Sequence, residues 1–134
     1  MEKSNWELKT YEVPGRRIVW TEGIGKAYPE AVQKVTEFVL AKAKGFGPGK
    51  WAYMPGIEKM DPIIDTETQK CFAEMHKKCE EAGCVAFAFI SGGMAAIKVQ
   101  SKRHHQQSHT TGIITEHFRT AEDGLMWLKE SFDL

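Results

Sequence analysis

The hydrophobic pattern of the chain centres on one uncharged run, from Cys84 to Ser91, which is followed by Gly92-Gly93. Its side chains are mainly aliphatic and aromatic, without regular alternation between polar and apolar positions. A run of this kind is typical of a strand that is buried on both faces of a sheet. We therefore expect it to lie inside a mostly parallel sheet.

Two alternating segments near the amino terminus predict a β-hairpin. The first runs from Trp6 to Val13 and the second from Arg16 to Glu22, with Pro14-Gly15 between them. A Pro-Gly pair between two such segments is a turn signal, so the strands should be antiparallel neighbours. We expect Gly23-Ile24-Gly25 to end the second strand.

Helical periodicity is found in three later segments, each with a start or stop signal. They are Tyr28 to about Lys44, the segment between the N-cap residue Asp65 and Gly83, and Ala121 to Ser131 after the capping residue Thr120. Apolar residues recur three and four positions apart in each helix. These residues are Val32, Val35, Phe38, Val39 and Ala43 in the first helix, Phe72, Met75, Cys79 and Ala82 in the second, and Leu125, Trp127 or Leu128, and Phe132 in the third.

Two short segments predict further strands, and one segment fits both periods. The strands are Lys50 to Met54, which ends before Pro55-Gly56, and Thr111 to Phe118. The segment from Met94 to His105 alternates in part like a strand, yet its alanines and apolar spacing also suit a helix. We favour a helix, because two consecutive glycines after a buried strand commonly make a tight strand-to-helix turn.

The predicted order of elements is β-β-α-β-α-β-α-β-α. Strands that alternate with helices pair in parallel through right-handed crossovers, here after one antiparallel hairpin. A chain of 134 residues fits one domain with a sizeable core. The sequence therefore predicts an α/β fold with a mixed five-stranded sheet and helices packed against it, in a single domain over residues 1–134.

Charge and cysteine content argue against several classes of protein. Lys plus Arg and Asp plus Glu each number 18, so no excess of positive charge favours nucleic acid or an anionic membrane. The three cysteines have no C-x-x-C spacing, which argues against a disulfide framework and fits a reducing compartment. No apolar run has the length of a signal peptide or a transmembrane helix. We therefore expect a cytoplasmic protein that binds no nucleic acid.

No motif points to a cofactor or a metal ion. Gly49-Lys50 follows a predicted helix and opens a strand, which reverses the context of a phosphate-binding loop. His105 and His109 lie four residues apart, but no acidic or thiol ligand is near them in sequence to complete a metal shell. Histidines at an exposed helix end are the better interpretation. We therefore assign no cofactor, no metal site and no catalytic residue.

Two groups of residues are expected at the carboxyl ends of the parallel strands, one in the turn before the second helix and one at the end of the buried strand. Carboxylates at a helix start usually cap it, and paired glycines usually only turn the chain. Ligands and partners of open α/β sheets nevertheless gather at this edge. The candidate binding residues are therefore Asp61, Asp65, Thr66, Glu67, Ser91, Gly92 and Gly93.

Three features together resemble a known family: the strand pair interrupted by a turn, the buried strand that ends near Ser91-Gly92, and the ending from Phe118 to Leu128. That ending has a phenylalanine, a short cap, acidic residues, and then a small residue, Leu and Trp-Leu. The chain in this way resembles the STAS domain of anti-sigma-factor antagonists and of the cytoplasmic tails of sulfate transporters, and more closely its SpoIIAA-like branch. The resemblance implies a bacterial, non-enzymatic regulatory module.

The phosphorylation site of the antagonists does not carry over. Their acceptor serine stands in an Asp-Ser-Ser-Gly turn that opens the second helix and is phosphorylated by a partner kinase. The matching stretch here keeps Asp65 and has Thr66 as a conservative replacement, whereas Glu67 stands in place of the acceptor serine and Thr68 in place of the glycine. A fixed carboxylate imitates only part of the charge of a phosphate.

These observations give one main hypothesis and its alternatives. The main hypothesis is a STAS-like regulatory or binding module that takes a protein partner or a small or lipidic ligand along the edge formed by residues 61–68 and 91–93. The alternatives are a small-molecule or lipid-binding protein, or a small enzyme that uses Ser91, Asp61 or the histidines in a cleft at the strand carboxyl ends. A homodimer with an apolar interface is a further alternative.

Overall fold

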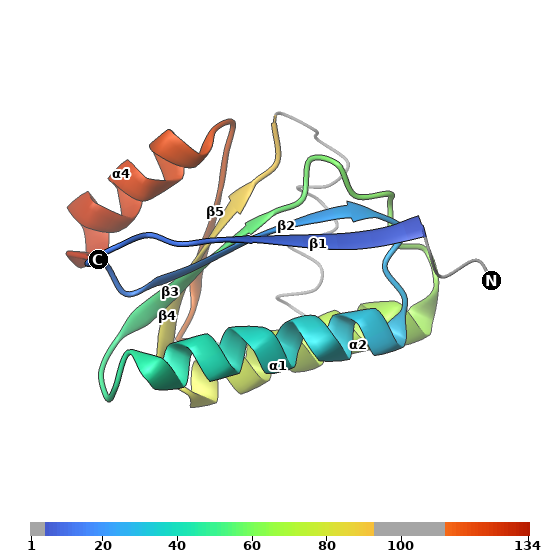
Figure 1. Ribbon diagram of the computed structural model, residues 1–134, viewed down its shortest axis with the longest axis horizontal. Helices are drawn as coiled ribbons and strands as arrows, with labels where there is room; N and C mark the ends of the chain where they lie inside the picture. The colour runs from blue at the N-terminus through green and yellow to red at the C-terminus, as the bar shows by residue number, and fades with distance from the viewer. Residues whose placement is uncertain (1–4, 93–111) are drawn as a thin grey trace.

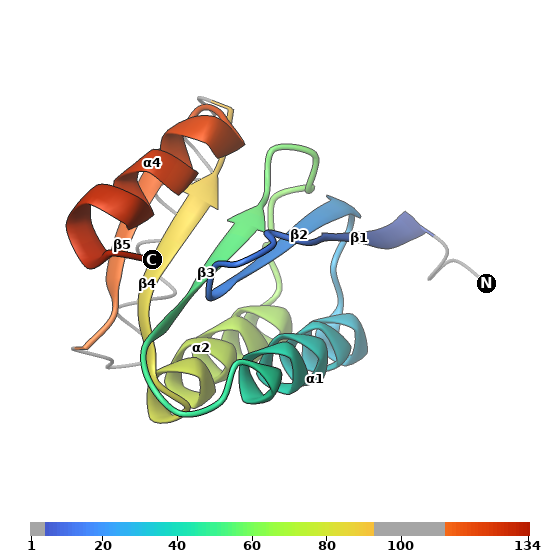
Figure 2. The ribbon, with the colours of Figure 1, turned by 60° about the vertical axis from the view of Figure 1, so that its left-hand side comes forward.

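The computed structural model describes residues 5–92 and 112–134. In this part of the chain, helices α1 and α2 lie on one face of a five-stranded sheet and α4 lies on the other (Figure 1, Figure 2). The elements in chain order are β1 (Trp6–Tyr11), β2 (Ile18–Gly25), α1 (Pro29–Gly45), β3 (Trp51–Gly56), α2 (Thr66–Glu81), β4 (Cys84–Ile90), β5 (Ile114–Phe118) and α4 (Ala121–Phe132).

The strands lie in the sheet in the order in which they occur along the chain, β1-β2-β3-β4-β5. β1 is antiparallel to β2, and the other neighbours are parallel. The steps from β2 to β3 and from β3 to β4 go the same way along the sheet, so right-handed crossovers place α1 and α2 on the same face. The predicted α/β fold with a mixed sheet is confirmed, whereas the predicted helix from Met94 to His105 lies outside the described residues.

The core has two layers of different composition, because β3 and β4 are covered on both faces. Phe87 and Phe89 face α1 and α2, while Ala86 and Ala88 face α4. The small residues let α4 approach closely at Gly124, where an added Cβ would lie 3.0 Å from Ile90 Cδ1. The predicted burial of the run that begins at Cys84 is thus confirmed, with two phenylalanines on one face and two alanines, flanked by Val85 and Ile90, on the other.

β3 and β2 both run further than the sequence predicted. β3 continues through Pro55, although a proline inside a sheet removes one donor. Ala52 donates its N–H to Arg17 O at 3.0 Å, so β3 bonds to β2 through alternate residues, and the missing donor of Pro55 falls on the β4 side. Bonding to β4 resumes at once, where Ile57 N–H donates to Ile90 O at 2.9 Å.

β2 extends to Gly25 because that residue also pairs with Trp6 and bridges to Met60.

Two adjacent arginines before β2 tie the sheet to both helix layers. A guanidinium presents several N–H donors in a fixed fork, so one side chain can satisfy several carbonyl groups. Arg17 donates to four carbonyls of the turn between α1 and β3, and Arg16 donates to two carbonyls at the end of the chain. The acceptors are the oxygens of Phe46, Gly47, Pro48 and Lys50 for Arg17, and those of Leu125 and Leu134 for Arg16.

Helix α2 starts where the sequence predicted, with Asp65 as its N-cap. The carboxylate oxygen Oδ2 accepts hydrogen bonds from the Thr68 N–H at 2.9 Å and from Thr68 Oγ1 at 2.5 Å. These two bonds hold the pKa of Asp65 below its usual value. Asp65 therefore has a structural role at the amino end of α2.

We expect Arg17→Lys to lower the free energy of unfolding by about 2 kcal/mol, because an ammonium group cannot serve the four carbonyls that the guanidinium fork reaches. Urea denaturation measures the change. Arg119→Lys is the matched control, since Arg119 is exposed, and it should change stability by less than about 0.5 kcal/mol. Equal effects of the two substitutions would contradict the role of Arg17.

We expect Asp65→Ala to cost about 1 kcal/mol at neutral pH through loss of the N-cap. The pKa of Asp65 is lower in the folded chain than its reference value of 3.8. The stabilisation is therefore fully present above that reference value and is lost as the pH falls through the folded pKa. Denaturation of both proteins at pH 7 and at about pH 2 tests this, with Asp61→Ala as the control from the exposed loop. A pH-independent difference would contradict it.

Candidate functional site

The two predicted groups of site residues lie on either side of β3. The backbone N–H of Asp61 donates to Gly25 O at 2.9 Å, beside the end of β2. The backbone N–H of Ser91 donates to Phe118 O at 2.9 Å, between the ends of β4 and β5. Both groups are thus at the predicted carboxyl edge of the parallel strands, but the end of β3 separates them.

The acidic turn is a surface feature. Asp61, Asp65, Thr66 and Glu67 are all exposed, and Asp65 is engaged as the cap of α2. Ile64 was not among the predicted site residues, and its side chain is 81% exposed between these carboxylates. The sequence shows the pair Ile63-Ile64, but it does not show that Ile63 is buried and Ile64 exposed.

Ser91 and Gly92 form a tight buried corner at the end of β4, while Gly93 lies outside the described residues. The Ser91 side chain is 0% exposed, and its Oγ has no hydrogen-bond partner in the described parts of the chain. Gly92 has a φ of 60°, and an added Cβ would lie 2.6 Å from Glu58 Oε2. Glu58, which was not among the predicted site residues, therefore lies across Gly92. The positive φ favours glycine at this turn, whereas the exposed Glu58 side chain is flexible and can move aside.

A cavity of about 40 Å³ lies between the sheet and helices α1 and α2. Its walls come from the carboxyl halves of β2, β3 and β4, from the two helices, and from the edge strand β1. Ligand pockets are commonly concave, mostly apolar spaces with a few polar groups. The lining residues are Trp6, Leu8, Thr21, Gly23, Val32, Val35, Tyr53, Pro55, Gly56, Ile57, Met60, Phe72, Met75, His76, Phe87 and Phe89.

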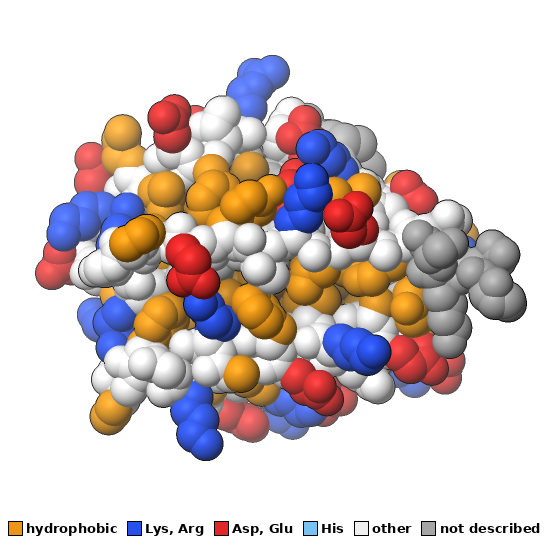
Figure 3. Space-filling view, viewed as in Figure 1, with side chains coloured by type: hydrophobic (Ala, Val, Ile, Leu, Met, Phe, Trp, Pro, Cys, Tyr) orange, Lys and Arg blue, Asp and Glu red, His pale blue; other side chains and the backbone are white. Residues whose placement is uncertain are grey.

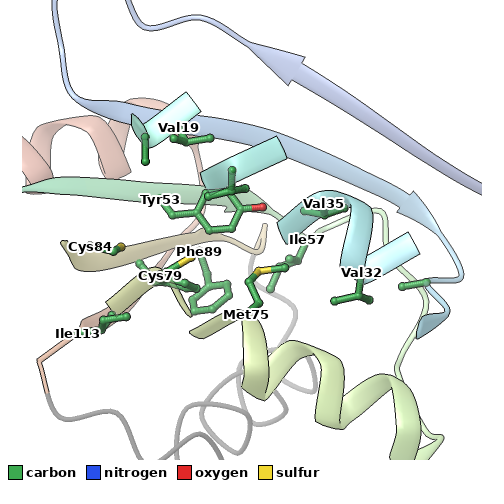
Figure 4. Close-up of a cluster of buried hydrophobic side chains, with 14 of the residues drawn as sticks. Val19, Val32, Val35, Tyr53, Ile57, Met75, Cys79, Cys84, Phe89 and Ile113 are labelled. Carbon is green, nitrogen blue, oxygen red and sulfur yellow. The ribbon is translucent and has the colours of Figure 1, made fainter. Parts of the chain in front are cut away.

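The cavity wall is mainly apolar and contains one defined polar pair. Thr21 Oγ1 and Tyr53 OH are 2.7 Å apart, and either oxygen can be the donor. Burial raises the pKa of Tyr53, so the phenol stays protonated. In Figure 4 the Tyr53 hydroxyl points toward Val35 of α1, across the space between sheet and helix. The pair thus offers both a hydroxyl donor and acceptor lone pairs inside an apolar wall.

A group of aromatic rings forms the side of the cavity nearest β4. The rings of Phe87 and Tyr53 meet edge to face with centroids 5.3 Å apart, and the ring of His76 lies 4.5 Å from that of Phe87. Phe89 stacks on His117 of β5 at 4.9 Å. Such contacts stabilise the rings beyond simple burial and fix their positions. The wall on this side is therefore built from mutually packed rings.

On the other side, the cavity is closed at Gly23. An added Cβ on Gly23 would lie 2.6 Å from Trp6 Cη2 and 3.0 Å from Met60 Sδ. Trp6 and Met60 therefore close over the glycine from the edge strand and from the loop after β3. Trp6 is partly exposed and Met60 is buried, so this closure lies at the outer boundary of the core.

The reactive side chains near the cavity favour binding over covalent chemistry. Burial raises the pKa of the Cys84 thiol to about 12 and raises that of Cys79 as well, so neither is a thiolate at neutral pH. Among the described residues, no three His, Cys, Asp or Glu side chains are grouped in a way that could hold a metal ion. The arrangement can enclose an apolar group and offer it one hydrogen-bonding pair.

Sequence reasoning did not find this cavity, although one signal for it was present. His76 lies on the stripe of α2 that includes Phe72, Met75 and Cys79, and it is 2% exposed. A histidine on an apolar stripe marks a polar atom turned toward the core. The other lining residues come from separate elements, and no local pattern relates them.

Comparisons with known proteins concern the fold. No protein-family model matches the chain, and no curated protein matches it significantly. A solved structure of an uncharacterized DUF3478-family protein with a SpoIIAA-like fold, from Shewanella loihica PV-4, is similar with a TM-score of 0.65 and 15% identity. The match covers 92% of this chain and 93% of that one. Within the described residues, no helix is both long enough and apolar enough to span a membrane. The chain therefore has a SpoIIAA-like fold, as the sequence resemblance implied.

Proposed function

We propose that this protein is a binding module that holds a small apolar molecule, or the apolar end of a lipidic one, in the cavity between the sheet and α1–α2. The observation that carries the proposal is the cavity itself, an apolar space at the carboxyl halves of parallel strands. Free cysteines without a disulfide agree with action in the reducing cytoplasm.

The size and polarity of the cavity limit the class of ligand. A water molecule needs about 10–15 Å³ of such volume and several polar partners, and purely apolar cavities stay dry and bind apolar guests. A cavity of about 150 Å³ holds benzene, so the volume of about 40 Å³ suits only a guest of a few non-hydrogen atoms, such as a short branched chain. The Thr21–Tyr53 pair adds a preference for a guest with one hydroxyl or carbonyl group, because that group can bond to the pair.

Val35 gives a direct test, because it lines the cavity while Val39, one turn further along α1, is buried without lining it. We expect 2-propanol at millimolar concentration to raise the melting temperature of the wild type by binding the folded state. Val35→Leu fills part of the cavity and should weaken 2-propanol binding about tenfold. Val39→Leu overpacks the core and should lower stability by about 1–3 kcal/mol, yet keep the shift caused by 2-propanol.

The two leucine variants decide the proposal together. An equal thermal shift in both variants, or no shift in the wild type, would contradict binding in the cavity. Propane is the ligand control, since it lacks the hydroxyl that can bond to Thr21 and Tyr53 and should cause a smaller shift than 2-propanol. Native mass spectrometry of the gently purified protein then tests for a molecule retained from the cell.

A protein partner at the acidic turn is the second candidate function, and it rests on Ile64. A large apolar side chain that is 81% exposed between Asp61, Asp65 and Glu67 has the form of a small docking site, with an apolar anchor and a charged rim. Its partner would present an apolar pocket surrounded by basic groups. The turn would then serve recognition without phosphorylation.

We expect Ile64→Ser to abolish retention of such a partner in a pull-down from the source cell, with no loss of stability. Ile114→Ser is the matched control, since Ile114 is also an exposed isoleucine, 55% exposed on β5. The control should retain the partner. Unchanged retention by Ile64→Ser would remove this candidate function.

A further inference from the structure

We infer that the free edge of β1 is a self-pairing surface, through which two copies of the chain join antiparallel into one continuous sheet. Among residues 5–92 and 112–134, β1 is the last strand on its side of the sheet, and it lies in front in Figure 1. Its residues Glu7 and Lys9 are exposed, and Trp6 and Leu8 are partly exposed. The inference is independent of which molecule occupies the cavity.

The backbone of β1 shows which groups are available at this edge. Asn5 O accepts a hydrogen bond from Lys26 N–H at 3.3 Å, and Asn5 is opposite Lys26 in the same register that pairs Trp6 with Gly25. In an antiparallel pair, residues alternate between bonding to the neighbour and pointing away from it. Glu7 and Lys9 therefore bond to β2, like Asn5. The N–H and C=O groups of Trp6, Leu8 and Thr10 point outward, toward the free edge.

The outward groups limit how a second copy can pair. Each outward residue must lie opposite another outward residue, so that the two exchange both hydrogen bonds. Placing Leu8 opposite Leu8 of the second copy does this, and it also brings Trp6 opposite Thr10 in both directions. The whole of β1 then takes part, and the arrangement has the two-fold symmetry of most homodimers.

Charge selects this register over its neighbours. With Leu8 at the two-fold axis, Glu7 of each copy lies directly opposite Lys9 of the other. This is a non-hydrogen-bonded pair, in which side chains are closest, and opposite charges there are stabilising. A shift toward the amino end would place Glu7 opposite Glu7, and a shift toward the carboxyl end would place Lys9 opposite Lys9. Both shifts bring like charges together, so Glu7-Leu8-Lys9 is self-complementary in only one of these registers.

The apolar side chains beside β1 support the pairing of this edge with a second copy. Figure 3 shows hydrophobic side chains at the surface on both sides of β1. On the side of α1, Trp6 and Leu8 line the cavity, so the leucine of a second copy would lie against the outer wall of that cavity. On the other side, the rings of Tyr11 and Trp20 stack 4.5 Å apart, and Tyr11 is 37% exposed.

Charge reversal tests the pairing, with the molar mass in solution as the readout. The wild type should be dimeric in sedimentation equilibrium at low ionic strength. Glu7→Lys creates two Lys–Lys pairs across the interface and Lys9→Glu creates two Glu–Glu pairs, so each variant should dissociate at least about tenfold more readily. In a mixture of the two variants, every pair across the interface is again Lys–Glu, and the dimer should return as a heterodimer.

The mixture separates interface effects from folding effects. Lys9 also lies opposite Glu22 within the chain, so Lys9→Glu adds a repulsion inside the monomer that mixing cannot relieve. Recovery of the dimer on mixing, with unchanged circular dichroism of each variant, supports pairing through β1. A monomeric wild type, or a dimer that survives each single reversal, would overturn the inference.

Discussion

The structure depends on one constraint, which is that β3 and β4 must be covered on both faces. Every residue of β3 is buried, and the residues of β4 divide into phenylalanines on one side and alanines on the other. Where the alanines lie, α4 can approach until Gly124 touches the sheet. The aromatic rings lie on the other face, against α1 and α2. The cavity is found on this second side, where Trp6 and Met60 close it over Gly23.

The elements that depend on local signals could be predicted from the sequence. The hairpin at Pro14-Gly15, the caps at Asp65 and Thr120, and the buried run from Cys84 are all visible as short patterns, and the structure confirms them. The predicted end of β3 was wrong, because the effect of Pro55 depends on which neighbouring strand its missing N–H would face. That depends on the register between strands, which a single segment does not encode.

For the candidate site, too, only the features that depend on local patterns could be predicted from the sequence. The acidic turn and the Ser91 corner were placed at the correct edge of the sheet, since position after a strand is a local property. β3 separates these two groups, and Glu58 contacts Gly92. Both features depend on the path of the loop after β3. The cavity was harder to predict, because its lining residues Trp6, Tyr53 and His76 come from three elements that are distant in the chain. Only the buried histidine on the stripe of α2 indicated a polar atom inside.

An exposed edge strand carries a risk of uncontrolled pairing, which proteins usually limit with charged residues. In β1 the charges also select one register of pairing. Glu7 and Lys9 attract each other across the interface in the register centred on Leu8, and like charges repel in the neighbouring registers. A two-fold pair also uses the same edge of both copies, so growth stops at two chains, whereas pairing of β1 with the β5 edge of another copy would leave free edges at both ends and continue. Hence the charge pattern selects one register, and the two-fold symmetry of that register closes the assembly at two chains.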